Sequence, residues 1–66
     1  MFRFNREKIL AAFLEKQWSI YTLSRRAGVG YRAARKAVNG KAVGATIIAK
    51  IAAALELDAV KFLAED

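Results

Sequence analysis

Residues 19–40 read SIYTLSRRAGVGYRAARKAVNG, and this stretch decides the fold. Leu23 and Ala27 stand four residues apart, which places both on one face of a helix. Gly28 ends that helix, because glycine readily adopts the left-handed conformation that many helix C-termini use. A second helix follows at about residues 31–38. The stretch therefore predicts two short helices joined by a tight turn.

The residues before this pair predict one more helix, over about residues 6–16. Asn5 is a good N-cap, because its side-chain oxygen can accept a backbone N–H of the first turn. Phe4 and Ile9 occupy the two positions of a hydrophobic staple, which packs the entering chain against the helix. The N-terminal region is therefore expected to form a capped, amphipathic helix.

The region after the pair predicts two further helices. Gly44 and Ala45 open the first of them, and its apolar residues recur with the 3.6-residue period of a helix. These residues are Ile47, Ile48, Ile51, Ala52 and Leu55. Asp58 is an N-cap for a last short helix. Five helices in 66 residues leave no room for a sheet, so we expect one compact all-α domain over residues 1–66.

The composition argues against an enzyme or a metal protein. The chain has no cysteine and no histidine, which excludes disulfides and the usual zinc sites. Its acidic residues lie towards the two ends, so no acid–base pair presents itself. We expect no cofactor, no metal and no small-molecule substrate. No apolar run approaches the ~20 residues that cross a bilayer, and no signal-peptide pattern is present. The sequence therefore predicts a cytoplasmic protein with no membrane partner.

Basic and acidic residues are distributed unevenly. Twelve basic residues and six acidic ones give a formal net charge of +6. Residues 16–54 contain no acidic residue but eight basic ones, namely Lys16, Arg25, Arg26, Arg32, Arg35, Lys36, Lys41 and Lys50. Charge kept only for solubility would normally mix both signs. A segment of one sign at this length instead favours a polyanionic partner.

The central pair of helices resembles the Cro/cI helix-turn-helix of phage repressors, the lambda-repressor-like or Xre-type family. The resemblance is carried by LSRRAGVGY (residues 23–31), Ala34, Ala37 and NGK (39–41), then by AKIAAAL (49–55), Asp58 and FL (62–63). It extends over nearly the whole chain. It implies a compact five-helix domain whose second and third helices form a DNA-binding helix-turn-helix.

The resemblance also implies which residues contact DNA. The helix at about residues 31–38 is expected to enter the major groove, whose width suits an α-helix. The expected base-contacting residues are Tyr31, Arg32, Arg35 and Lys36. The expected phosphate-contacting residues are Ser19, Arg25, Asn39, Lys41 and Thr46. Lys41 would act together with the free N–H groups that open the next helix near Ala45 and Thr46.

Some of these side chains have alternative interpretations that do not involve DNA. Arg25 and Arg26 could simply be solvated, and Asn39 could be only a helix C-cap. Tyr21 fits equally a packed surface residue or a phosphate donor. Trp18 and the phenylalanines are interpreted as core or dimer contacts rather than as platforms for stacked bases.

The inner face of the motif requires small side chains. Ser24 stands where two helices cross closely, a position at which the family usually has alanine. The residues expected to face inward are Leu23, Val29, Ala34 and Ala37. Ala34 and Ala37 replace larger aliphatic residues, and we interpret the surplus aromatic residues as offsetting the lost volume.

Three other positions depart from the family pattern. Ile20 stands where a glutamine often contacts phosphate, so that contact is expected to be absent or made by Ser19 and backbone N–H groups. Gln17 and Glu56 stand where glycine usually ends a helix. Because a left-handed non-glycine residue costs about 1 kcal/mol, we expect these two helix ends to be shaped differently.

The function implied by the resemblance is sequence-specific transcriptional regulation, by a phage or prophage repressor in the simplest case. Two alternatives use the same fold: an antitoxin-like protein-interaction module, and the DNA-binding part of a longer repressor. A membrane-surface peptide is a poor fit, because three glycine-punctuated turns would serve no purpose in a single interfacial helix.

A homodimer is expected on operator DNA, because one short recognition helix contacts only a few base pairs. The expected contact surface comprises Leu57, Val60 and Phe62, together with Val38. The alternative is that these residues complete the core of the monomer, which suits Val60 and Leu63 better than Phe62.

Overall fold

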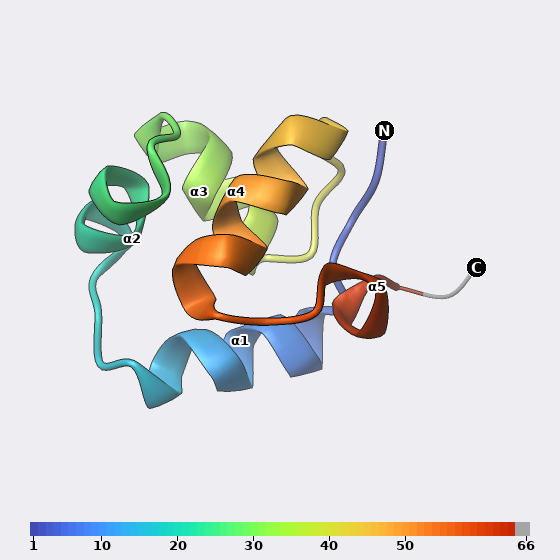
Figure 1. Ribbon diagram of the computed structural model, residues 1–66, viewed down its shortest axis with the longest axis horizontal. Coiled ribbons are helices and arrows are strands. Elements are labelled where there is room, and N and C mark those ends of the chain that lie inside the picture. Colours follow the sequence, from blue (N-terminus) through green and yellow to red (C-terminus); the bar gives the residue numbers. More distant parts are fainter. Residues whose placement is uncertain (65–66) are drawn as a thin grey trace.

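The computed structural model describes residues 1–64, which fold into five helices (Figure 1). These are α1 (Arg6–Glu15), α2 (Ile20–Ala27), α3 (Tyr31–Val38), α4 (Ala45–Leu55) and α5 (Ala59–Phe62). No strand forms within this part of the chain, so the predicted all-α fold is confirmed. Residues 65 and 66 of the expected domain lie outside the described residues.

Helix α4 lies at the centre of the packing. It contacts α2, α3 and α5, while α2 and α3 pack against each other as the helix-turn-helix prediction requires (Figure 1). The predicted apolar stripe of α4 is confirmed, because Ile48, Ile51, Ala52 and Leu55 are buried and Ile47 packs against them. Helix α1 covers the opposite side of the core and contacts α3.

The N-caps predicted at Asn5 and Asp58 are confirmed, and Ser19 caps α2 in the same way. Each accepts a hydrogen bond from a backbone N–H in the first turn of its helix. The pairs are Asn5 with Lys8 (3.0 Å), Ser19 with Thr22 (3.1 Å) and Asp58 with Val60 (3.1 Å). Phe4 and Ile9, the expected staple, are both completely buried in the core. Local sequence signals thus set the beginnings of these helices.

The ends of α1 and α4 differ from the prediction. Gln17 and Glu56 each have a φ of 59°, the same left-handed conformation that Gly28 adopts after α2. The expectation that these ends are shaped differently is therefore wrong. After α4 the reason is visible: Leu57 N–H donates to the Ala52 carbonyl at 2.8 Å, a hydrogen bond that closes the helix end and requires the left-handed residue before it.

The expected dimer surface is also partly wrong. Val38 is 3% exposed and belongs to the core of the monomer, as does the packed side of Phe62. Val60, by contrast, is 77% exposed, which agrees with its place on the expected contact surface and contradicts the alternative that it completes the core. The error arises because α5 is a single short turn. Which of its residues face inward depends on how α5 packs against α1 and α4. Helical spacing over only four residues does not predict this packing.

An extended N-terminal segment joins parts of the chain that are distant in sequence. Phe2 and Val43 exchange two backbone hydrogen bonds, with N···O distances of 2.8 and 2.7 Å. Asn5 N–H donates to the Phe62 carbonyl at 2.7 Å. Residues 2–5 therefore tie the start of α1 to the loop before α4 and to the end of α5.

Among residues 1–64, no helix combines the length and the apolar character that crossing a lipid bilayer requires.

We predict that Glu56→Gly is more stable than Glu56→Ala by about 0.5–1 kcal/mol. Glycine relieves the left-handed strain, which outweighs its larger freedom in the unfolded chain. Both variants lose the weak, exposed ion pair between Lys16 Nζ and Glu56 Oε1 at 3.7 Å. The difference between their free energies of unfolding therefore reports the effect of the backbone conformation alone. Urea unfolding measures it, and an alanine variant as stable as the glycine variant would contradict this account.

Candidate nucleic-acid interface

Helix α3 divides cleanly into an inner and an outer face. Ala34, Ala37 and Val38 are buried, with Ala34 and Ala37 completely so. Leu23 is likewise completely buried, and Val29 packs against the core, so the predicted inward residues are confirmed. The outer face carries the four expected base-contacting residues, all of them exposed: Tyr31, Arg32, Arg35 and Lys36. The 3.6-residue period thus directs every cation of α3 towards solvent.

A groove runs along this outer face and into the turn that follows α3. Its lining residues are Arg32, Arg35, Lys36, Asn39 and Lys41. Three of the four expected base-contacting residues and two of the five expected phosphate-contacting residues therefore meet in one place. Within residues 1–64 no acidic side chain lines the groove. Tyr31 lies apart from it, at the first position of α3.

The turn between α2 and α3 holds the groove in its orientation. Gly28 has a φ of 70°, and Val29 N–H donates to the Ser24 carbonyl at 3.1 Å, closing the end of α2. The Ser24 hydroxyl in turn donates to the Val29 carbonyl at 2.7 Å. The prediction that Ser24 must be small covers only half of its role. In the family that the sequence resembles, alanine usually stands at this position, so serine is the sequence signal for the other half of the role, a hydrogen bond across the turn.

The other expected phosphate-contacting residues lie outside the groove. Ser19 is exposed, but its hydroxyl already accepts from Thr22 N–H and donates to Thr22 Oγ1, both at 3.1 Å. Thr46 is exposed in the first turn of α4. Gly44, the N-cap of α4, provides no side-chain hydrogen bond, so the first N–H groups of this helix remain open to a ligand.

Arg25 lies on a separate surface formed by α2. A second hollow is lined by Tyr21, Thr22, Arg25 and Arg26. The Arg25 guanidinium lies 5.8 Å from the centre of the Tyr21 ring, and that of Arg26 lies 4.9 Å from the centre of the Trp18 ring. Tyr21 is thus a surface residue packed by a cation. Trp18 is partly buried against the core, as its interpretation as a packing residue requires.

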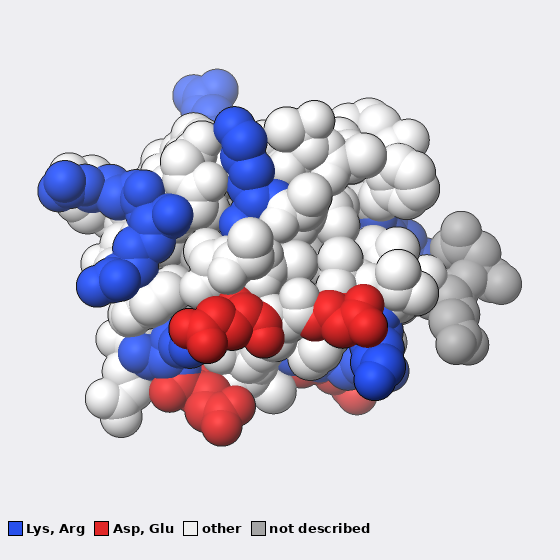
Figure 2. All heavy atoms as spheres, in the orientation of Figure 1, with Lys and Arg blue, Asp and Glu red and all other residues white. Residues whose placement is uncertain are grey.

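Charge is partitioned over the visible surface of the molecule. In Figure 2, acidic side chains gather along the lower edge, where α1 and the connection from α4 to α5 lie in Figure 1, and basic ones stand among them. Over α2, on the left, the same view shows basic side chains alone. On this face, α2 is therefore a region at which an anion meets attraction without nearby repulsion.

Comparisons of the chain with protein-family models, with curated proteins and with solved structures return no match. The resemblance to the Cro/cI helix-turn-helix is therefore a hypothesis. It rests on the sequence of residues 23–41 and on the packing of α2 against α3.

Proposed function

We propose that this protein binds double-stranded DNA with α3 in the major groove and regulates transcription as a Cro/cI-type repressor. The observation that carries the proposal is the groove on α3, where Arg32, Arg35 and Lys36 meet Asn39 and Lys41. Cations along a helix give access to base edges, and the turn that follows gives access to the adjacent backbone. A bacterial or phage protein with this role would be located in the cytoplasm, where the DNA is.

In this proposal Arg32 and Arg35 read the sequence. A guanidinium can donate two hydrogen bonds to O6 and N7 of guanine, the commonest specific contact in the major groove. Arg32 and Arg35 lie three residues apart and therefore on one face of α3, which allows them to contact neighbouring base pairs. Asn39, Lys41 and the open N–H groups of α4 then bind the phosphates that flank the site.

The main rival is an antitoxin-like module that uses the same fold to bind a protein. Such a module would present apolar residues on the outer face of α3, since interface centres are depleted of charge. Here that face carries two arginines and a lysine. A DNA-binding domain of a longer repressor would have the same groove, and it falls within the proposal.

The first prediction concerns salt. If the groove and its surroundings neutralise about six phosphates, the logarithm of the association constant should fall with the logarithm of salt concentration at a slope of roughly −5. Titration of random duplex DNA at several salt concentrations measures the slope. A slope near zero would exclude DNA binding. If this protein bound an acidic protein saturably and had no affinity for DNA, the antitoxin alternative would be favoured.

The second prediction separates reading from positioning. Arg35→Ala should cost about 1–3 kcal/mol on the selected site and relax the preference at one or two base pairs. Lys41→Ala should weaken binding to all sequences alike and flatten the salt slope by about one. Selection of sites from random DNA with each variant gives both results. Loss of preference with Lys41→Ala, and its retention with Arg35→Ala, would reverse the two roles.

The third prediction is that two copies bind one two-fold symmetric site. The domain is too small to give operator-grade affinity alone, and two recognition helices about 34 Å apart would enter successive major-groove faces. Val60 is the exposed member of the predicted contact surface, so the self-contact is small and pairing is expected only on DNA. Analytical ultracentrifugation on a selected site gives the stoichiometry. One copy per duplex at saturation, on a non-palindromic site, would rule out the dimer.

A further inference from the structure

We propose that Arg6, in the first turn of α1, binds DNA backbone phosphate together with Asn39 and Lys41. The phosphate-binding surface would then be assembled from two segments that are far apart in the sequence. This inference rests on the proposed function, because it adds a residue to the same interface. Arg6 belongs to none of the motifs that the sequence resembles.

The turn after α3 lies directly against the start of α1. Gly40 separates Asn39 from Lys41 and has a φ of 74°. A Cβ placed on Gly40 would lie 2.9 Å from Arg6 Cβ, closer than real Cβ atoms come to a neighbour, and 3.3 Å from Arg6 Cα, which is tighter than most such contacts. Asn39 and Lys41, the two candidate phosphate-contacting residues, therefore flank a glycine that packs against the backbone of Arg6.

This approach is held in place by backbone hydrogen bonds. The Phe2–Val43 pair joins the N-terminal segment to the loop that follows Lys41. Asn5, the residue immediately before Arg6, donates its N–H to Phe62 at 2.7 Å. The position of Arg6 relative to the turn is therefore set by the main chain on both sides, whatever side chains occupy the surface.

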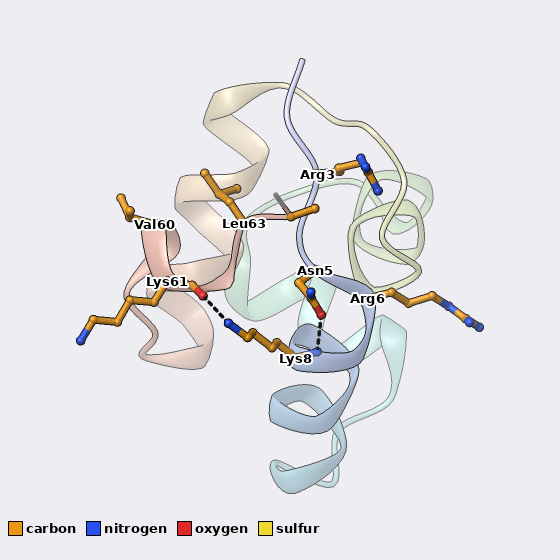
Figure 3. Close-up of a pocket in the computed structure, with 8 residues that line it drawn as sticks. Arg3, Asn5, Arg6, Lys8, Val60, Lys61 and Leu63 are labelled. Carbon is orange, nitrogen blue, oxygen red and sulfur yellow. Dashed lines mark hydrogen bonds between the residues drawn. The ribbon is translucent and has the colours of Figure 1, made fainter. Parts of the chain in front are cut away.

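The Arg6 side chain is available to a ligand. It is exposed, and within residues 1–64 it has no hydrogen bond or ion pair. Figure 3 shows Arg6 and Lys8 extending in opposite directions from α1. Lys8 turns towards α5, where its Nζ donates to the Lys61 carbonyl at 3.4 Å. Both residues line the hollow between α1 and α5, but only the Arg6 side chain extends away from α5 (Figure 3).

Phosphate is the ligand that this arrangement fits best. A guanidinium presents several N–H donors in one plane and binds phosphate oxygens in pairs, while Lys41 adds a compact second charge. Asn39 contributes an amide donor from the other side of Gly40. The rival role for Arg6 is purely structural: a cation near the C-terminal end of α3 stabilises the helix dipole.

The test compares Arg6→Gln with Lys8→Gln, which removes the same charge from the same helix on the opposite side. Arg6→Gln should flatten the salt slope of DNA binding by about one, so that the affinity lost between about 50 and 200 mM salt shrinks by roughly 3.5-fold. Its preferred site should be unchanged. Lys8→Gln should keep the wild-type slope, and Arg6→Lys should recover most of it.

The outcomes separate the two proposals. If the wild-type protein shows no salt-dependent binding, the proposed function falls and this inference falls with it. If the wild-type slope is steep and Arg6→Gln matches Lys8→Gln, only the inference is overturned. Thermal unfolding of the same variants covers the structural role: a lower melting temperature for Arg6→Gln with an unchanged salt slope would assign Arg6 to the helix dipole and overturn the phosphate role.

Discussion

The complete burial of the inner face of α3 is the constraint on which the rest of the structure depends. An eight-residue helix is not stable alone in water, so α3 exists because its inner residues pack against α2 and α4. Ala34 and Ala37 are completely buried, and their small size is compatible with a close approach of the three helices. The same burial aims the arginines of α3 outward. The inner face of this short helix thus packs in the core, and its outer face carries the residues that are proposed to contact DNA.

The turns that follow the helices show where glycine is needed and where it is only convenient. Gly28 and Gly40 both adopt a left-handed conformation, but a Cβ on Gly28 would meet nothing within 4 Å, whereas one on Gly40 would meet Arg6. Glu56 takes the same conformation with a side chain and tolerates the strain, because Leu57 then packs against the core. Conformational strain of about 1 kcal/mol is bearable at such a turn. Contact with the backbone of another segment is the stricter constraint.

The sequence predicts those features of the fold that depend on neighbours along the chain. The helices, the N-caps and the stripe of α4 follow from the 3.6-residue period and from side chains that reach their own first turn. Local signals do not predict the burial of Val38 or the exposure of Val60. They also do not predict the left-handed conformation of Gln17 and Glu56. The N-terminal segment is the clearest case, because its hydrogen bonds with Val43 and Phe62 use main-chain groups that every residue carries. A side-chain pattern contains no trace of such pairing.

This N-terminal segment bears directly on how the proposed interface would work. Helix α3 is held at its beginning by the Ser24–Val29 hydrogen bond and at its end by the contact of Gly40 with the start of α1. Binding DNA would therefore require the ordering of exposed side chains but not of the main chain, and avoiding backbone ordering lowers the cost of association. A rigid α3 also sets where each guanidinium can reach, so that a wrong base leaves a donor unpaired rather than prompting the helix to shift. Sequence discrimination by so small a domain would depend on this rigidity more than on the number of its contacts.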